Sequence, residues 1–148
     1  MASERFTGDV ESIRKARQFV RSQLVDVCAQ SSDVDDAILI TSELASNVVT
    51  HALTDFELVV LTTDAAIRIE IHDGVAVSEA FHDLITNPPV TIDVTAVGGR
   101  GLILLSSTAH RFGLIDNGAS GKAIWFEIDR RPGDIGHAPN AQHQLRGR

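Results

Sequence analysis

Glu43 and Asn47 are four positions apart in a stretch whose apolar residues recur at helical spacing. Residues at this spacing lie on one face of a helix, and His51 continues the same line. A carboxamide in such a position can ligate a magnesium ion that bridges phosphates. A carboxylate one turn away can orient or deprotonate an attacking hydroxyl group or water molecule. Taken alone, the pair also fits an ordinary solvent-facing helix edge.

Asp73 ends a segment with the alternation of a β-strand. Its isoleucines, Ile67, Ile69 and Ile71, point to one face of that strand. The same alternation predicts that Asp73 lies on the apolar face, where a carboxylate needs polar partners. There it can accept a hydrogen bond from an adenine amino group, and Gly74 lets the chain turn sharply after it. An ordinary Asp-Gly turn is the alternative interpretation.

A glycine-rich turn, Gly98-Gly99-Arg100-Gly101, precedes an apolar segment that predicts a helix carrying Leu102. Backbone N–H groups at the start of a helix can hold phosphate, and an arginine adds a charged contact. The segment lacks the Gly-x-x-x-x-Gly-Lys-Ser/Thr pattern, which excludes a P-loop. Many glycine turns only begin helices, so this motif is weak when it stands alone.

The composition is that of one globular domain of 148 residues. Its formal net charge of −7 argues against non-specific nucleic-acid binding, which needs a positive surface. No run approaches the roughly 20 apolar residues that cross a membrane, and the first residues lack a signal pattern. We therefore expect a cytoplasmic protein that contacts neither nucleic acid nor a membrane.

Cysteine, histidine and tryptophan give no further site. The single cysteine, Cys28, cannot form an internal disulfide, and its apolar helical surroundings predict a buried thiol. The six histidines are too scattered to form a metal set. The only tryptophan, Trp125, is expected to be a packing anchor.

The remaining periodicity predicts helices and strands joined by one long irregular segment. In chain order we expect an extended arm at 5–9, helices at 10–29 and 34–52, and strands at 56–62 and 66–73. An irregular segment at 74–97, with a short helix at 78–85, is expected next. A helix that follows the turn 98–101 and a hairpin of 111–116 with 123–128 complete the order. An N-cap cluster, Ser31-Ser32-Asp33, separates the long helices. Long irregular segments are often functional loops or lids. The pattern indicates one domain over 1–130 and a disordered tail over 131–148.

The order of the motifs is more specific than any one of them: Glu-x-x-x-Asn on a helix, Asp-Gly after a strand, and Gly-Arg-Gly-Leu opening a helix. This order resembles the GHKL-type ATPase fold of histidine kinases, gyrase and the Hsp90 chaperones. Within that group the chain most resembles the small anti-sigma-factor serine/threonine kinases, including the actinobacterial set. The resemblance rests on 43–52, 99–102 and 121–127 and covers roughly residues 5–130.

The resemblance implies an α+β fold, in which a mixed, largely antiparallel sheet carries helices on one face and nucleotide lies between the two layers. It also implies a role for each matching residue. Asn47 coordinates Mg2+, and Glu43 is the candidate general base. The other matching residues bind ATP: Asp73 and Gly74 at the adenine, and Gly99, Arg100, Gly101 and Leu102 at the phosphates.

The kinases of this family phosphorylate a serine or threonine of a small anti-anti-sigma partner, and they bind a sigma factor in the alternative complex. The resemblance therefore implies an ATP- and Mg2+-dependent protein kinase that regulates transcription through these two partners. It also implies a homodimer.

One box departs from the wider superfamily, which usually has Asp-x-Gly-x-Gly. Here Val75 and Val77 replace the two glycines, and branched side chains stiffen or narrow the hinge of a lid. A second hypothesis is therefore a module of the same fold that binds a sigma factor or its antagonist without kinase activity. A detached histidine-kinase catalytic domain is weaker, because the sequence shows no helix pair with a phospho-accepting histidine.

Overall fold

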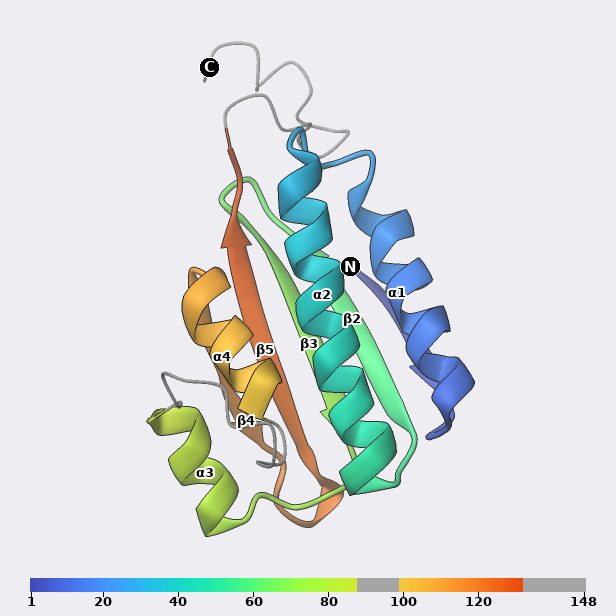
Figure 1. Cartoon of the computed structure of the whole chain (residues 1–148), viewed down its shortest axis with the longest axis vertical. Helices are drawn as coiled ribbons and strands as arrows, with labels where there is room; N and C mark the ends of the chain where they lie inside the picture. Colours follow the sequence, from blue (N-terminus) through green and yellow to red (C-terminus); the bar gives the residue numbers. More distant parts are fainter. Residues whose placement is uncertain (88–98, 132–148) are drawn as a thin grey trace.

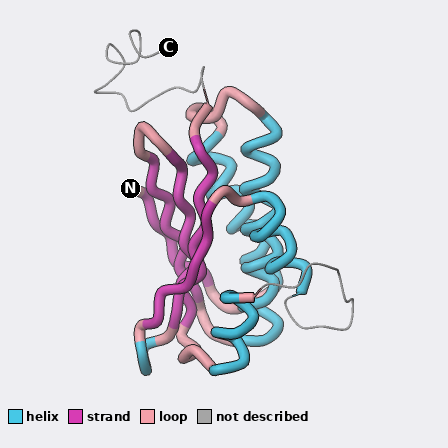
Figure 2. Tube along the Cα trace, turned by 90° about the vertical axis from the view of Figure 1, so that its left-hand side faces the viewer, coloured by secondary structure: helices cyan, strands magenta, loops and turns pink. Residues whose placement is uncertain are grey.

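The computed structural model describes residues 1–87 and 99–131. These residues form a sheet with α1, α2 and α4 packed on one of its faces and α3 at one end (Figure 1, Figure 2). The elements are, in chain order, β1 (Ala2–Phe6), α1 (Val10–Leu24), α2 (Ser31–Asn47), η1 (Val48–Ala52), β2 (Phe56–Thr62), β3 (Ala66–Asp73), α3 (Glu79–Thr86), α4 (Gly99–Thr108), β4 (Arg111–Asp116), η2 (Gly118–Ser120) and β5 (Lys122–Asp129).

The sheet has the strand order β1-β2-β3-β5-β4, and each of these pairings is antiparallel. The two-layer α+β prediction is therefore confirmed. The expectation of a mixed sheet is wrong for the strands that the structure describes. β5 reaches its place beside β3 through a hairpin with β4, so it runs opposite to both of its neighbours.

The core lies between the sheet and the helices. Every second residue of the central strands points into it, as the alternation predicts. Phe6 and Phe56 stack there at 5.3 Å between ring centroids, which joins the edge strand to the core. The fully buried apolar side chains come from both layers: Ala16, Val20, Leu24, Ala37, Ile40, Leu44, Ala45, Phe56, Leu58, Ile69, Leu105, Ala123 and Phe126.

Among the described residues, no helix packs on the other face of the sheet (Figure 2). Trp125 packs there over Gly113, where a Cβ would lie 2.8 Å from the indole, and Arg68 covers its ring at 4.0 Å. Trp125 is thus a packing anchor, as predicted.

Burial opposes the ionisation of Glu70 on the same face, but hydrogen bonds from His72 and Arg68 outweigh it and lower the pKa of that carboxyl group.

Helix α1 begins after Asp9, whose carboxylate accepts a hydrogen bond from the Ser12 N–H at 3.1 Å. It ends at Leu24, so the predicted end at 29 is wrong. The N–H groups of Val27 and Cys28 both turn back to the Leu24 carbonyl oxygen at 2.9 Å, which closes the helix early. Two valines and an aspartate follow Leu24, and these residues favour helix weakly. Cys28 lies past the helix and is half-buried rather than buried.

Helix α2 begins at Ser31 with Gln30 at its N-cap, and no side chain caps it. The predicted cap cluster Ser31-Ser32-Asp33 is therefore wrong, because these residues form the first turn. A carboxylate is favoured in that turn by the partial positive charge of the helix end. Asp33 is buried there at 3% exposure, and Arg131 forms an ion pair with it.

The helix predicted over 34–52 changes its geometry at Asn47. α2 ends there, and the chain continues as the π-helix η1 before Leu53 terminates it in the left-handed region, at φ 58° and ψ 31°. π-Helical turns occur often at functional sites, where they re-aim side chains.

The other elements follow the predictions closely. β2 and β3 have the predicted bounds, the C-terminal hairpin agrees within one residue, and α3 forms with Ser78 as its N-cap. β1 begins before the extended arm expected at 5–9. Residues 88–98 of the predicted irregular segment and 132–148 of the predicted tail lie outside the described residues. None of the helices in the described ranges is long and apolar enough to cross a bilayer.

Candidate functional site

Five elements meet at one end of the molecule: the C-terminal end of α2, the N-terminal end of α4, α3, the end of β3 and the start of β5 (Figure 1). A cavity of about 320 Å³ lies at this end, lined by residues of α2, η1, β3, α3, β5 and the segment between β3 and α3. Its lining residues are Leu44, Asn47, Val48, His51, Ala52, Ile71, Asp73, Val75, Ala76, Ser78, Ala80, Phe81, Leu84, Lys122 and Ile124. Mostly apolar walls with a few polar side chains are typical of small-molecule sites.

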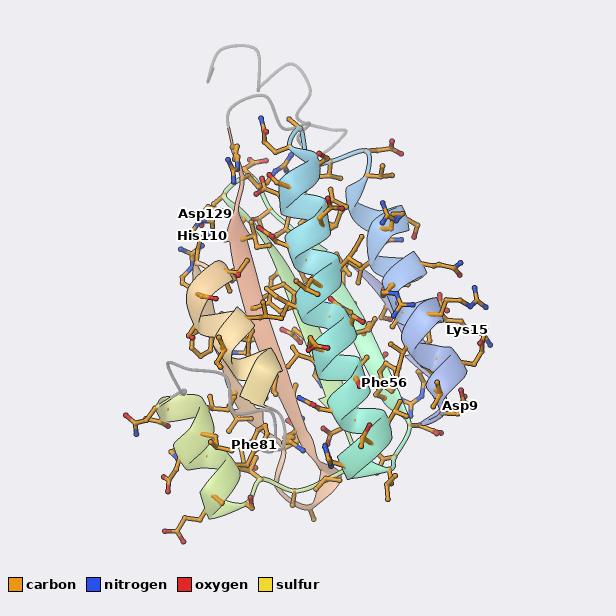
Figure 3. All side chains as sticks on the ribbon, viewed as in Figure 1. Asp9, Lys15, Phe56, Phe81, His110 and Asp129 are labelled. Atoms are coloured by element: carbon orange, nitrogen blue, oxygen red, sulfur yellow. The ribbon has the colours of Figure 1, made fainter. Side chains whose placement is uncertain are left out.

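The walls come from both layers. Ile71 and Ile124 rise from neighbouring strands, at paired positions in the β3–β5 ladder. Leu44 and Val48 face them from α2 and η1, and Phe81 closes the side formed by α3. Figure 3 shows Phe81 on the side of α3 that faces the sheet. This arrangement leaves a flat apolar slot between helix and sheet.

Asp73 lies at one end of this slot with its side chain only 7% exposed, so the predicted position on the apolar face is confirmed. Its partner is Lys122, the residue directly opposite it on β5. The lysine Nζ lies 3.0 Å from each carboxylate oxygen, and the lysine side chain is 9% exposed. The N–H of Val75 also donates to Oδ1 at 2.8 Å. The buried carboxylate therefore has the polar partners that its position demands.

Glycines shape this end of the slot in two different ways. Gly121 has a φ of +119°, and a Cβ there would lie 1.9 Å from the carbonyl oxygen of Asp73, so only glycine fits between the hairpin and β3. Gly74 does not have a positive φ, and a Cβ there would make ordinary contacts with Thr54. The turn after β3 therefore does not require the glycine that we expected to be needed.

The glycine turn and the Glu-x-x-x-Asn helix also meet. A Cβ on Gly101 would lie 3.3 Å from Asn47 Nδ2, 3.4 Å from Leu44 Cδ2 and 3.7 Å from Glu43 Cβ. Gly101 is buried against α2, so α4 begins beside the C-terminal half of that helix. Residues predicted from two distant motifs are thus packed together.

Asn47 lines the cavity, whereas Glu43 is half-buried one turn earlier and is not part of the lining. Gly99 and Arg100 open α4 with Gly101, and Leu102 follows. The surroundings of the Arg100 and Leu102 side chains, together with Gly98, lie outside the described residues. Their expected phosphate contacts remain predictions.

Residues 6–128 match the histidine kinase-like ATPase domain. The chain belongs to this family. As a histidine kinase-like ATPase domain it has a kinase-type, ATP-binding fold, and the predicted GHKL-type resemblance is confirmed.

A solved structure shares the fold of this ATPase domain. The crystal structure of the RsbU and RsbW domains of Rv1364c from Mycobacterium tuberculosis superposes with a TM-score of 0.61 at 16% sequence identity. The match covers 89% of the present chain and 34% of the other, so our chain corresponds to about a third of that protein. A search of curated proteins found no match.

No group of three His, Cys, Asp or Glu side chains in the described ranges could hold a metal. Mg2+ usually needs only one or two protein ligands, because substrate phosphates and water supply the rest. The Asn47 carboxamide, at the cavity wall beside the start of α4, is a group that could serve as such a ligand.

Sequence reasoning missed two residues of this ATPase domain that lie in the cavity, Lys122 and Phe81. The lysine Nζ lies 4.9 Å from the centre of the phenyl ring, within the range of a cation–π contact. One signal was present in the sequence. Lys122 is separated from Phe126 and Ile128 by an even number of positions along the strand. That parity places Lys122 on the core-facing side of its strand, where a lysine needs an anionic partner.

Proposed function

We propose that this chain binds Mg-ATP in the cavity and acts as a serine/threonine protein kinase on an anti-anti-sigma partner, with a sigma factor as its second partner. One observation supports the proposal above all. Asn47 and Asp73 line one cavity, and Gly101 packs against Asn47 although it lies far from it in the sequence. The structural neighbour contains an RsbW domain, and the shared fold agrees with the resemblance to anti-sigma-factor kinases on which this hypothesis rests.

In this proposal adenine occupies the slot between Ile71 and Val48, with its amino group donating to Asp73. The phosphates then extend toward the N-terminal end of α4, where Gly99, Arg100, Gly101 and Leu102 begin the helix. Backbone N–H groups and the positive end of a helix favour phosphate at such a place. Asn47 is the protein ligand proposed for Mg2+, which supplies charge neutralisation to the phosphates when it is bound.

Glu43 is the proposed general base. It lies one turn before Asn47 on α2 and close to Gly101, so its carboxylate can accept the proton of a substrate hydroxyl at the phosphate end of the site. Phosphoryl transfer depends mainly on positioning and on charge stabilisation, which these residues provide. The proposal includes a cytoplasmic homodimer that contacts neither nucleic acid nor membrane.

The test is phosphate transfer from γ-labelled ATP to a candidate anti-anti-sigma protein in the presence of Mg2+. We expect the wild type to transfer phosphate. In Glu43→Gln and in Asn47→Ala we expect the rate of transfer to fall by about 100-fold or more. Glu4→Gln on exposed β1 is the matched control and is expected to keep full activity. Equal transfer by Glu43→Gln and the wild type would remove Glu43 from its proposed role.

The alternative function is a partner-binding module of the same fold without kinase activity. The observation in its favour is the altered aspartate box, because Val75 is held by Asp73 through its N–H and is 37% exposed at the mouth of the cavity. Calorimetry with Mg-ATP separates the two functions. Binding heat for the wild type, reduced in Asn47→Ala, supports the kinase, whereas no heat with the wild type supports the module.

A further inference from the structure

Lys122 lies at the end of the proposed nucleotide site that would hold the adenine base. The family motifs assign no role to this lysine. Its Nζ contacts both oxygens of Asp73 at 3.0 Å, and its third donor points toward the Val75 carbonyl oxygen at 3.5 Å. Phe81 of α3 covers it from another side. A single ammonium group thus joins β3, the segment after it, α3 and β5.

These contacts leave one oxygen of Asp73 able to accept a further hydrogen bond. A carboxylate oxygen can accept about two hydrogen bonds, and Oδ1 is occupied by Lys122 and by the Val75 N–H. The contact of Oδ2 among the described residues is Lys122, so this oxygen can accept one more donor. Two buried groups held on one another fix the direction of the carboxylate.

We propose that Lys122 is a positioning residue that makes Asp73 a fixed, acceptor-only group and thereby selects adenine over purines with an oxygen at position 6. Adenine presents an amino donor at that position, which matches an acceptor. Hypoxanthine presents a keto oxygen there, and an acceptor facing another acceptor leaves both without a partner. Sites built on such a polar match discriminate strongly, because a mismatched ligand leaves buried polar groups unpaired.

The ammonium group of Lys122 is what holds Asp73 toward the base. Without it, Asp73 is a lone carboxylate in a mostly apolar cavity, which is costly unless the side chain turns toward water. A carboxylate that has turned away no longer offers its oxygen to the amino group of adenine. Loss of Lys122 therefore weakens the distinction between the two bases.

The inference rests on the proposed nucleotide site, and its test separates the two. Binding of Mg-ATP and of Mg-ITP is measured by calorimetry for the wild type, Lys122→Met, Lys122→Arg and Lys15→Met. Lys15 is the other lysine of the chain and lies on α1, away from the cavity (Figure 3). Circular dichroism establishes that each variant is folded.

We expect the wild type and Lys15→Met to prefer ATP by about tenfold or more, and Lys122→Met to reduce this preference to about threefold or less. Lys122→Arg keeps the charge and is expected to keep most of the preference. If Lys122→Met does not fold, Lys122→Gln replaces it, because the amide still donates to Asp73 but carries no charge, and the same loss of preference is expected.

An unchanged ATP/ITP ratio in the folded neutral variant overturns the role of Lys122 and leaves the nucleotide site intact. A wild type that prefers ITP or binds both equally also overturns it. A wild type that binds neither nucleotide overturns the proposed function itself, and the inference falls with it.

Discussion

At the scale of single residues, two buried side-chain oxygens have no hydrogen-bond partner among the residues that the structure describes, Asp33 Oδ2 and Thr41 Oγ1, and only Thr41 also has no ion pair there. Its side chain is fully buried in α2, and its hydroxyl has no hydrogen-bond partner among the residues that the structure describes. A buried hydroxyl without a partner costs about 1–3 kcal/mol relative to water. No contact of Thr41 in the cavity lining explains its retention.

Thr41→Val removes this hydroxyl while keeping the shape of the side chain. We expect the free energy of unfolding to rise by about 1 kcal/mol, because the valine methyl group has no polar requirement in the core. Urea denaturation followed by circular dichroism measures the change. Thr41→Ser is the matched control, since it keeps the hydroxyl and loses a methyl group, and it should be less stable than the wild type. A destabilised valine variant would show that the hydroxyl has a partner in solution.

At the scale of elements, the contact between α4 and α2 carries the most specific prediction. Gly101 allows the two helices to approach at the height of Asn47. Gly101→Ala places a methyl group 3.3 Å from Asn47 Nδ2, so the carboxamide must shift by a few tenths of an ångström. Alanine favours helix over glycine by roughly 0.5–1 kcal/mol, which offsets part of the crowding.

We therefore expect Gly101→Ala to fold with a thermal midpoint close to that of the wild type but to bind Mg-ATP about tenfold more weakly. Ser106→Ala, on an exposed position of the same helix, is the control and should change neither quantity. Thermal denaturation and calorimetry give the two numbers separately. Unchanged affinity in a folded Gly101→Ala would show that Asn47 does not need this position to bind nucleotide.

The elements also show where sequence patterns succeed and where they stop. The bounds of β2 and β3 were predicted correctly, because turn residues flank both strands and β3 alternates strictly. The change from α2 to the π-helix η1 was not predictable, since the apolar spacing continues through it. That change depends on packing against the rest of the molecule rather than on local preference. The end of α1 was placed too late for a different, local reason: the apolar spacing continues past Leu24, although the valines and the aspartate that follow favour helix weakly.

For the candidate site, the motif order predicted the residues that converge, but not how they are connected. Asp73 was expected to need partners, and parity alone placed it on the core face. Its partner, Lys122, is 49 positions away in sequence, and only the pairing of β3 with β5 shows that the two are opposite one another. The close approach of Gly101 to Asn47 likewise depends on how α4 packs on α2, which no local pattern encodes.

At the scale of the whole molecule, an ion pair connects the segment after β5 to the helical layer. Arg131 follows β5, and its Nη2 donates to Asp33 Oδ1 in the first turn of α2 at 2.7 Å. Its Nε lies 2.7 Å from Oδ2, which forms an ion pair but has no hydrogen-bond partner among the described residues. The boundary that we predicted after residue 130 therefore leaves out a residue that contacts the domain.

The burial of the two partners decides how much this pair stabilises. The Asp33 side chain is 4% exposed, whereas that of Arg131 is 49% exposed, so removing the arginine leaves a buried carboxylate without its cation. We expect Arg131→Ala to lower the free energy of unfolding by about 1–3 kcal/mol, discounted from a fully buried pair because the arginine is half in water. Asp33→Asn combined with Arg131→Ala should recover part of this loss, because the uncompensated charge is gone.

Arg14→Ala, which breaks an exposed pair with Glu11 on α1, is the control and should leave the denaturation midpoint unchanged. Equal effects of the two arginine variants would show that the pair between β5 and α2 does not form in solution.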